Sequence, residues 1–550
     1  MWVTPVILIC LICLPRVFCI ENKGKLFITA FPENVAFYDP VPHEHILLLT
    51  AVTGNTHVSI CVASVEKLSK TLKAAATEMV TLETPVELDR SQFSQNSVVI
   101  RSTKDITVLA KSKRNDIEQL LVLQPVNSLG SLYYIPTLGL GEGSQNLLGY
   151  KDFYGARGKI VIINSEKKNT VKVNFNGENS KQELEPFWVF QVNVSDSLPV
   201  SITAQHDIVV LLTHPCSNTT ICQCQMVVTQ LRPTNTWGTT FVVPSAFNNT
   251  ADSTPHLIVT SDQGVTFNST LQIGTGTNSP YSVSHLVYDL KTQYLNSSKH
   301  FSVTLIQPGH ISELTPVSSF SACYLLPEKT SISKALVIAP TLNVSQVYVG
   351  KDQISSEVEW KTVDSQPYSW AMIDLPSGEH RVIWHPSTKI GVYVKDGENW
   401  SEAISITTEP ALQGCLLDRA RYSVMDQSGT WAEMVGHCQQ ENGELLSINN
   451  EGILRELSQS LSNPSKQEEV WVGLRRRLLN GEWYWLNKQP MNITKWFQGQ
   501  PGSSEDKFCA SMSLSSDNNE NFRWMSRSCC HVLKPVCYKH NVYFPLAAPT

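Results

Sequence analysis

Three consecutive arginines, Arg475, Arg476 and Arg477, have a side-chain chemistry that can be judged from the sequence alone. Guanidinium groups donate paired hydrogen bonds to carboxylate, sulfate and phosphate oxygens. We therefore treat the triplet as a candidate contact for sulfated or sialylated glycans, or for an acidic protein. A short run of charged residues is more often a solvated loop, and that simpler interpretation is the alternative.

Patterns typical of catalysis are incomplete in this chain. His43-Glu44-His45 spaces its two imidazoles too closely to place them on one helical face, as a metalloprotease requires. The glycine-rich stretch 139–143 lacks the Lys-Ser/Thr ending of a phosphate-binding loop. The sequence also has no Gly-x-Ser-x-Gly nucleophile elbow. We expect a protein that is not an enzyme, and we assign no catalytic residue.

Residues 1–19 resemble a signal peptide. Their apolar run, Val6 to Leu14, is too short to cross a membrane, and Val17 and Cys19 are small enough for a cleavage site. We therefore predict a secreted, extracellular product. No later stretch reaches the roughly 18 apolar residues of a spanning helix, so no membrane span is expected.

The sequence contains eight Asn-x-Ser/Thr sites, which become candidate glycosylation sites once the chain is exported. Where a glycan is attached, the asparagine should lie at the surface. The sites are Asn193, Asn218, Asn248, Asn268, Asn296, Asn343, Asn399 and Asn492.

The cysteine count becomes odd when the predicted signal peptide is removed. Of the 14 cysteines, Cys10, Cys13 and Cys19 lie in the signal, which leaves eleven. In an oxidising compartment an odd number leaves one thiol free or bridged to another chain, so a disulfide-linked dimer is possible.

Several of the eleven cysteines cannot be paired from their spacing. Three of them surround the Asn218 site, where a local hairpin disulfide is expected; a zinc site would need more ligands than the one nearby histidine, so no metal is assigned. Cys530 cannot pair with its neighbour Cys529 without strain, and Cys415 is one candidate partner. The cysteines without an assigned partner are Cys61, Cys216, Cys222, Cys224, Cys323, Cys415 and Cys530.

A motif with two prolines eleven residues apart occurs three times. Its copies run from Leu123 to Pro136, from Leu231 to Pro244 and, more loosely, from Leu314 to Pro327. Each copy begins Leu-x-Pro and ends in a strand-like run, and residues 24–30 resemble its second half. Proline and glycine interrupt regular structure, so the motif predicts a turn followed by a strand.

Short strand-like runs follow each copy of the motif, for example 159–163, 170–173, 188–192 and 208–212 after the first. The copies lie roughly 80 to 110 residues apart, which is the size of a β-sandwich module, whereas a propeller blade has about 40 to 45 residues. We predict about four repeated β units over residues 20–410. Helical periodicity is scarce there, and 65–79 is the main helical candidate.

The last quarter of the chain combines cysteines and aromatic residues in a fixed order. The pattern is Trp431-Ala432-Glu433, Cys438, Trp471-Val472-Gly473-Leu474, Trp483-Tyr484-Trp485, Cys509, Trp524, Cys529 and Cys537. This frame closely resembles the C-type lectin-like fold, an α+β binding module. The resemblance implies the disulfides Cys438–Cys537 and Cys509–Cys529. We place the domain at 411–540, followed by a tail at 541–550.

Within this domain the residue pattern predicts individual elements. Helices are expected at 431–438 and 451–461, the second from its apolar spacing, and a strand at 443–448. The stretch 471–474 resembles the core strand of the fold, and Trp483 and Trp485 follow on alternate strand positions. The aromatic residues are expected to form core.

The resemblance also implies a calcium-bridged sugar site, which can be checked position by position. Members that bind mannose or galactose carry Glu-Pro-Asn or Gln-Pro-Asp in a long loop, and Trp-Asn-Asp later. This chain reads Gln500-Pro501-Gly502 and Trp524-Met525-Ser526, and Lys507 takes the place of an acidic ligand beside Glu505 and Asp506. Since calcium needs about 6 to 8 oxygen ligands, no calcium or other cofactor is expected. Gln500 and Trp496 remain candidate ligand contacts, although core packing is the favoured interpretation of Trp496.

The repeated motif copies, together with 378–383 and 390–394, resemble the N-terminal region of the mucus IgG Fc-binding protein family. The likeness spans most of 24–400. That family continues into von Willebrand-type cysteine-rich repeats, whereas this chain continues into a lectin-like domain. The resemblance therefore implies a secreted binding role in mucosa or matrix, without carrying Fc binding over.

Together these observations predict a mostly β chain, with tandem β-sandwich-like repeats followed by an α+β C-type lectin-like domain. The net charge of −6 implies no surface for nucleic acid. We expect non-covalent binding of an extracellular protein, glycoprotein or glycan, in mucosal defence, adhesion or matrix assembly. The alternatives are a calcium-dependent carbohydrate-binding lectin with a degenerate motif, and an enzyme or toxin built on the β repeats, which requires a pocket of clustered titratable residues.

Overall fold

The structure is a computed structural model. It describes residues 21–33, 44–82, 86–114, 117–137, 158–175, 178–194, 199–214, 227–247, 255–262, 282–287, 292–307, 310–326, 330, 332–375, 381–396, 399–461, 468–502, 506–515, 517 and 519–546. The chain forms two compact units. We call Met1–Cys415 with Phe544–Thr550 the array, and Leu416–Tyr543 the lectin-like unit.

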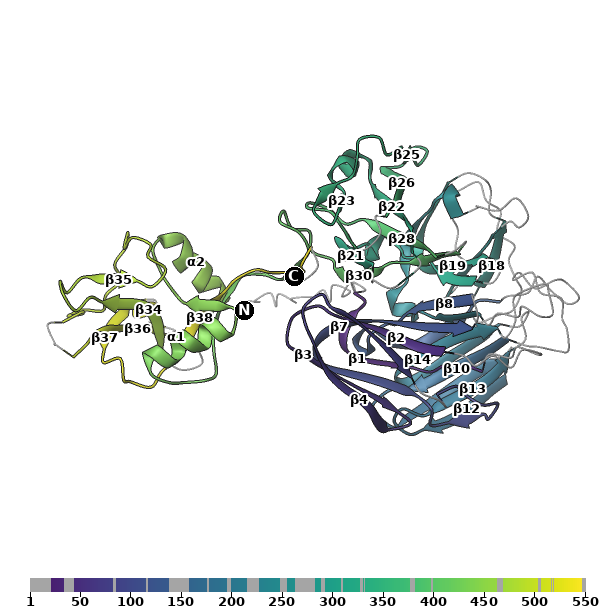
Figure 1. The fold of residues 1–550 in the computed structure, drawn as a ribbon, viewed down its shortest axis with the longest axis horizontal. Coiled ribbons are helices and arrows are strands. Elements are labelled where there is room, and N and C mark those ends of the chain that lie inside the picture. The colour runs from purple at the N-terminus through teal and green to yellow at the C-terminus, as the bar shows by residue number, and fades with distance from the viewer. Residues whose placement is uncertain are drawn as a thin grey trace, which may run out of the picture. The chain divides into compact units, whose positions relative to one another are not determined.

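The chain is mostly β, as the sequence predicts, and strands organise both units (Figure 1). Three long strands dominate the array: β7 (Val98–Arg114), β14 (Val200–His214) and β19 (Gln293–Gln307). No helix among the residues listed above is long and apolar enough to cross a membrane.

Each long strand forms the centre of one repeated segment of the array, and it changes partners along its length. The first part of the long strand pairs with the strand that opens the segment, and its last part pairs with a short strand that follows in a hairpin. The opening strands are β1 (Lys23–Thr29), β9 (Gly130–Ile135) and β16 (Gly238–Val243), and the hairpin strands are β8 (Ile117–Val122), β15 (Val227–Gln230) and β20 (His310–Glu313). In the first segment, Ile100 and Val108 from the two parts of β7 meet in one buried core.

Further strands widen the sheets of the three segments built on β7, β14 and β19. In the first, β4-β3-β7-β2-β5 is the strand order, and in the second it is β12-β11-β14-β10-β13-β6. In the third, β16-β19-β17-β18 is the order. The bounds are β2 Glu44–Ala51, β3 Thr56–Val62, β4 Val65–Leu72, β5 Thr77–Leu82, β6 Phe93–Ser94, β10 Gly158–Asn164, β11 Asn169–Phe175, β12 Glu178–Leu184, β13 Val189–Val194, β17 His256–Ser261 and β18 Ser282–Val287, with a 3₁₀ turn η3 at Ser245–Phe247.

The helix expected at 65–79 is wrong. These residues form β4 and the start of β5, with a turn between them in which Ala75 adopts a φ of 57°. The apolar spacing of Val65, Leu68 and Leu72 suggested a helix, but Val65 is 57% exposed and Leu72 is buried. Pairing of β4 with β3 in a hairpin, and of β5 with β2, decides the conformation, because strand pairing outweighs a weak helical pattern.

Each copy of the two-proline motif forms the turn and strand that the sequence predicts. The Leu-x-Pro segment leads into a 3₁₀ turn, and a strand follows at once. The turns are η1 (Val126–Ser128), η2 (Thr234–Thr236) and η4 (Val317–Ser319), followed by β9, β16 and β21 (Cys323–Leu326).

The rest of the array, after η4, contains two sheets. Their orders are β24-β23-β27-β21-β30 and β25-β26-β22-β28-β29. The bounds are β22 Lys334–Pro340, η5 Thr341–Gln346, β23 Tyr348–Val349, β24 Asp352–Gln353, β25 Lys361–Thr362, β26 Tyr368–Asp374, β27 Arg381–Trp384, β28 Gly391–Asp396, β29 Asn399–Glu402 and β30 Ile404–Thr407.

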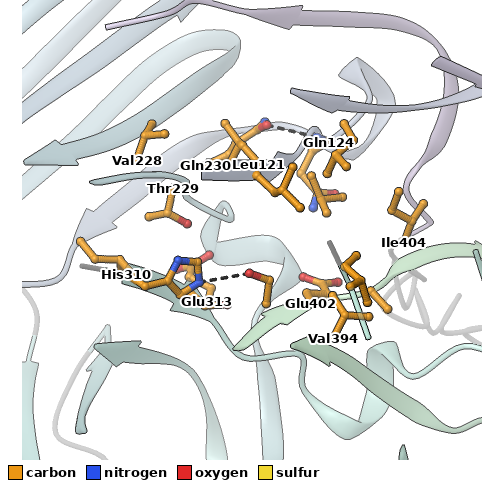
Figure 2. A pocket seen from close by; sticks show the side chains of 18 of the residues that line it. Leu121, Gln124, Val228, Thr229, Gln230, His310, Glu313, Val394, Glu402 and Ile404 are labelled. Carbon is orange, nitrogen blue, oxygen red and sulfur yellow. Dashed lines mark hydrogen bonds between the residues drawn. The ribbon is translucent and has the colours of Figure 1, made fainter. Parts of the chain in front are cut away.

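The array closes on itself. The backbone N–H of Asn22 donates to the Ser405 carbonyl at 2.9 Å, and the Ser405 N–H donates to the Asn22 side chain at 2.8 Å. At its centre β8, β15, β20 and β29 lie side by side around a small cavity (Figure 2). The three segments built on β7, β14 and β19 and the region after η4 follow one another along the chain. In space these four segments form a ring.

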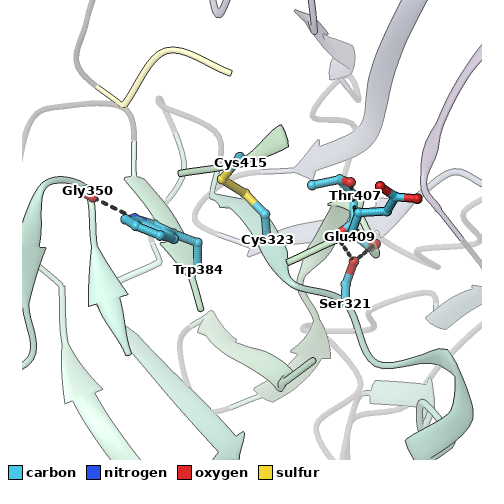
Figure 3. Close-up of a disulfide and its surroundings, with 8 residues drawn as sticks. Ser321, Cys323, Gly350, Trp384, Thr407, Glu409 and Cys415 are labelled. Atoms are coloured by element: carbon cyan, nitrogen blue, oxygen red, sulfur yellow. Dashed lines mark hydrogen bonds between the residues drawn. A yellow bond between two sulfur atoms is a disulfide. The ribbon is translucent and has the colours of Figure 1, made fainter. Parts of the chain in front are cut away.

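A disulfide joins Cys323 of β21 to Cys415, the last residue of the array before the lectin-like unit (Figure 3). The suggested pairing of Cys415 with Cys530 is therefore wrong. Beside the disulfide, Trp384 Nε1 donates to the Gly350 carbonyl at 2.8 Å. Cys61 and Cys530 are free, whereas the cluster Cys216, Cys222 and Cys224 lies outside the described residues.

The lectin-like unit has the helices that the sequence predicts, α1 (Trp431–Gln440) and α2 (Glu451–Ser460). The expected strands are also present: β33 (Gly443–Leu445), β34 (Glu468–Arg476) and β35 (Trp483–Trp485). The main sheet has the order β32-β38-β34-β36-β37, with β33 on β38 and β35 on β34. The other bounds are β32 Arg421–Val424, β36 Cys509–Leu514, β37 Trp524–Arg527 and β38 Lys534–Lys539.

The lectin-like unit begins and ends in a two-stranded stem. β31 (Leu416–Asp418) and β39 (Val542–Tyr543) pair antiparallel, so the chain enters and leaves the unit at the same place. Just beyond the stem, the Phe544 N–H donates to the Cys415 carbonyl at 2.8 Å, and the Phe544 side chain is buried.

Candidate functional site

The frame of the lectin-like unit is held by disulfides and tryptophans. Cys438 pairs with Cys537, and Cys509 with Cys529, which is the pairing that the resemblance implies. Trp431 Nε1 donates to the Val472 carbonyl at 2.9 Å. This bond fixes the first helix against β34, the strand that leads to the arginine triplet.

The loop that carries Gln500 is closed by its own hydrogen bonds. Gln500 Oε1 accepts from the Ser526 N–H at 3.0 Å and from the Ser526 hydroxyl at 2.7 Å. The Gln500–Pro501 peptide is cis, and Gly502, at a φ of 68°, has no side-chain oxygen. The one neutral oxygen at the first ligand position is thus already engaged inside the protein.

The second ligand position is no better suited to a cation. The Met525 sulfur lies 3.4 Å from an Arg527 nitrogen, and Ser526 is fully buried against Gln500. Calcium prefers several carboxylate and carbonyl oxygens, so this donor set does not fit the ion. Asp506 is exposed, and Glu505 lies outside the described residues.

Trp496 belongs to an aromatic cluster. Its ring meets those of Trp483 and Trp524 edge to face, with centroids 4.8 and 5.8 Å apart. Trp524 is fully buried, and Trp496 packs on the same core. Trp496 thus packs against the core and is half-buried, which favours the core interpretation.

The arginines lie at the end of β34, on the hairpin that leads to β35. Arg475 lies over the Trp431 ring and Arg477 over the Tyr484 ring, each 5.2 Å from the ring centroid. Arg476 turns inward, and its Nε donates to the Gly481 carbonyl at 3.0 Å. The hairpin therefore presents two of its three guanidinium groups outward.

The tip of this hairpin is apolar. Leu478 and Leu479 are 79% and 102% exposed, next to the exposed Arg475 and Arg477. Stacking on aromatic rings limits the freedom of an arginine side chain and leaves its donors available. The hairpin thus combines two oriented cations with an exposed apolar tip, whereas Gln500 and Trp496 are committed elsewhere.

The candidate glycosylation sites differ in exposure. Asn193 and Asn492 are exposed, and Asn296 and Asn343 are half-buried. Asn218, Asn248 and Asn268 lie outside the described residues, as does the side chain of Asn399.

A second group of polar and charged side chains lies at the centre of the array, where no sequence motif predicts a site. The cavity there has a volume of about 70 Å³ (Figure 2). Arg232 forms an ion pair with Glu402 of β29, and its backbone N–H donates to Glu313 of β20 at 2.7 Å. Since Arg232 and Glu313 are buried, this network ties three segments of the ring together.

Burial also sets the charge of the central groups. It raises the pKa of Glu313 to about 7, with Arg232 opposing the rise. It lowers the pKa of His310, which bonds Ser401 at 3.1 Å, to about 4. At neutral pH the cluster therefore holds a neutral histidine and a carboxyl group close to its midpoint.

Three buried polar atoms of the cluster have no hydrogen-bond partner among the described residues: Arg232 Nη1, Gln124 Oε1 and Gln230 Nε2. The enzyme hypothesis requires a pocket of clustered titratable residues, and this cluster is one. The cavity is small beside the roughly 300 to 1,000 Å³ of typical small-molecule sites, however. Its charged groups bind each other, which suits a structural joint better than a substrate site.

The repeat carries a signal for this cluster. The residue between leucine and proline in each motif copy is polar: Gln124, Arg232 and Thr315. In the structure their backbone N–H groups donate to side chains of the following segment, Gln230, Glu313 and Tyr393, at 3.1, 2.7 and 3.0 Å. A polar residue recurring between two apolar anchors could have indicated a buried network.

Comparison with known proteins places this architecture in a family. A model described as IgGFc binding protein matches residues 119–395, about half of the chain. The chain belongs to the IgGFc-binding protein family. A model of the C-type lectin domain matches residues 427–539 of this family member. Both names denote binding proteins rather than enzymes.

Relatives of this IgGFc-binding family member cover different parts of it. The human IgGFc-binding protein is 25% identical over 393 residues, which are 68% of this chain but only 7% of that protein's length. The C-type lectin lectoxin-Phi1 of Philodryas olfersii is 31% identical over 111 residues, which are 20% of this chain and 69% of the relative. A solved structure of human lithostathine is 23% identical, covers 22% of this chain and 83% of its own, and has a TM-score of 0.19.

Proposed function

We propose that this protein is secreted and binds acidic extracellular proteins, glycoproteins or glycans non-covalently, without calcium. The contact surface is the hairpin of Arg475, Arg477, Leu478 and Leu479. The observation that carries the proposal is that both outward arginines are oriented by aromatic rings, and neither pairs with a carboxylate of the residues that the structure describes. Such a surface suits mucosal defence, adhesion or matrix assembly.

Calcium independence is part of the proposal. Gln500, which would have to turn toward an ion, is held by two hydrogen bonds from Ser526. Breaking these two part-buried hydrogen bonds to free one neutral ligand would cost free energy without supplying a carboxylate. The alternative remains a calcium-dependent lectin with a degenerate motif.

Chromatography of the full chain on mannose-, galactose- and heparin-agarose, with and without a chelator, tests the proposal. We expect retention on heparin-agarose that weakens with salt and does not change with the chelator, because the contact is ionic. Retention on mannose or galactose that disappears with the chelator would establish the alternative.

A charge-matched pair of variants assigns the contact. Arg475→Gln with Arg477→Gln should weaken heparin binding about tenfold, because each lost charge-assisted hydrogen bond costs about 1 kcal/mol or more. Arg421→Gln with Arg455→Gln makes the same change in net charge at two other exposed positions and should have little effect. Equal losses in both variants would indicate nonspecific attraction and contradict a site at the hairpin.

The family match raises a second ligand class for the array. The human relative is named for binding IgG Fc, and its similarity to this chain extends across the array. We therefore propose immunoglobulin Fc as a second candidate ligand. Immobilised Fc should retain the full chain, and Arg475→Gln with Arg477→Gln should leave that retention unchanged, because the contact lies on the array. An absence of retention would remove this candidate.

A further inference from the structure

A second and larger cavity lies on the array, between β19 and the turn that joins β25 to β26. Its volume is about 370 Å³, within the range of sites that hold small molecules. The turn is shaped by Ser365, which adopts a φ of 58°. The residues that line the cavity are Thr292, Tyr294, Asn296, Val363, Asp364 and Gln366.

Asn296 lines this cavity, which we call the groove. It is also the first residue of an Asn-x-Ser site, Asn296-Ser297-Ser298. Thr240, its cross-strand partner on β16, donates from its hydroxyl to Asn296 Oδ1 at 3.1 Å. The Asn296 Nδ2, which is the atom that carries an N-linked glycan, has no hydrogen-bond partner in the described part of the chain. The amide is therefore oriented with its reactive nitrogen unoccupied.

Aromatic rings lie close to this asparagine. Tyr294 is two residues earlier on the same strand, so both side chains point to the same face. The Tyr294 ring stacks beside that of Tyr368, with centroids 6.5 Å apart and planes 25° apart. The C–H face of a sugar ring is apolar and packs well on such a surface.

The opposite wall of the groove is polar. Asp364 is exposed and Gln366 is half-buried, so their carboxylate and amide groups are available to hydroxyl and acetamido groups. A groove lined by one aromatic ring, that of Tyr294, and by planar polar groups is suited to a hexosamine. An attached sugar would reach it without any loss of translational freedom.

We propose that Asn296 is glycosylated and that this groove holds the first N-acetylglucosamine of its glycan. The sugar then contacts both β19 and the turn between β25 and β26. A covalently attached group thus fills the space between two segments of the ring and stabilises their packing. This inference does not depend on what the lectin-like unit binds.

The test uses the full chain secreted from animal cells. Glycopeptide mass spectrometry should find Asn296 occupied. Peptide-N-glycosidase applied to the folded protein should release the Asn296 glycan about tenfold more slowly than the glycan on the exposed Asn492, the factor expected from one aromatic contact. After denaturation the two rates should be equal. An unmodified Asn296, or equal rates in the folded protein, would overturn the proposal.

Variants separate a built site from simple crowding. Tyr294→Leu keeps an apolar side chain but removes the aromatic face, so release at Asn296 should become nearly as fast as at Asn492. If Tyr294→Leu is not secreted, Gln366→Ala tests the opposite wall by the same measurement. Slow release that persists in the variant would show that steric crowding alone protects the glycan, and the groove assignment would be wrong.

Removing the glycan without changing Asn296 tests its structural effect. Ser298→Ala destroys the acceptor site and keeps the bond from Thr240. We expect a lower melting temperature for the array and no change in Asn492→Gln, which removes a glycan from the other unit. An unchanged melting temperature in Ser298→Ala would contradict a stabilising role of the Asn296 glycan.

Discussion

At the scale of single residues, Glu313 and His310 lie on the same strand, β20, and burial moves their pKa values in opposite directions. A folded-state pKa above the unfolded value means that the folded protein holds the proton more tightly. Glu313 therefore stabilises the fold at low pH, and this contribution is lost as pH rises from about 4.5 through 7. His310 stabilises the fold above pH 6.5, and its contribution is lost as pH falls through about 4.

The two contributions oppose each other over most of this range, so single substitutions should reveal them. Relative to the parent protein, Glu313→Gln should gain stability as pH rises from 4.5 to 7, by up to about 3 kcal/mol. His310→Asn should lose stability relative to the parent as pH rises from 4 to 6.5, because its own contribution has been removed. Urea unfolding of the array at several pH values measures both differences.

The comparison with the parent protein cancels the other titrating groups. Glu313→Gln is also conservative in geometry, because its amide oxygen can still accept from the Arg232 N–H. A stability difference that does not vary with pH would show that these two groups titrate normally in the fold.

The residues of the two sites differed in how far the sequence could predict them. The loss of calcium ligands at Gly502, Met525 and Ser526 was visible because it depends only on the chemistry of each side chain. The central cluster was not, since Arg232 is 81 residues from Glu313 and 170 from Glu402. Only the folded ring brings these groups together.

At the scale of elements, a glycine and a proline form the same contact at three successive junctions. Gly24 packs against Pro125, Gly130 against Pro233 and Gly238 against Pro316. A Cβ built on Gly238 would lie 2.2 Å from the Pro316 Cβ. Each glycine thus marks where the opening strand of one segment crosses the turn of the next motif copy.

The substitution Gly238→Ala should destabilise the array by about 1 to 3 kcal/mol, the usual cost of overpacking a rigid contact. Gly54→Ala is the matched control in the same unit, because a Cβ there meets atoms only at ordinary contact distances, 3.7 Å and beyond. Chemical unfolding of both variants provides the measurement. Equal stabilities would mean that the junction can move apart without cost.

Sequence patterns predicted the elements of the lectin-like unit better than those of the array. The helix α2 has a continuous apolar face through Leu454 and Leu457 and an Asn450 cap that accepts from Ile453 at 3.0 Å, so local signals agree with the fold. In the stretch 65–79 the apolar spacing was weak, although Ser64 precedes it at the position of a helix cap. There the pairing of β3 with β4 prevailed over the local signal.

At the scale of the whole molecule, the odd cysteine count leads to a prediction about assembly. Cys530 is exposed and Cys61 is half-buried, and neither forms a disulfide. We expect a disulfide-linked dimer that Cys530→Ser abolishes and Cys61→Ser retains, since only the first thiol is readily reached by another chain. Gels run with and without reductant measure this, and identical mobility of the parent protein in both would refute the dimer.

The closure of the array was beyond the reach of the sequence. The spacing of the motif copies predicted units of sandwich size in tandem. The bonds of Asn22 to Ser405 depend on how each segment turns relative to the last, and no residue pattern encodes that angle directly. Ring closure also explains why the polar residues of the motif are buried, because all of them face the same centre.

The two-stranded stem has a consequence for the way proteases process this molecule. A single cut between Cys415 and Leu416 leaves the lectin-like unit joined to the short segment that begins at Phe544. That segment belongs to the array, where the Phe544 N–H donates to the Cys415 carbonyl and Leu546 lies beside Gly414. Release of the unit would therefore take two steps: a nick, followed either by extraction of the returning strand from the array or by a second nick on that strand.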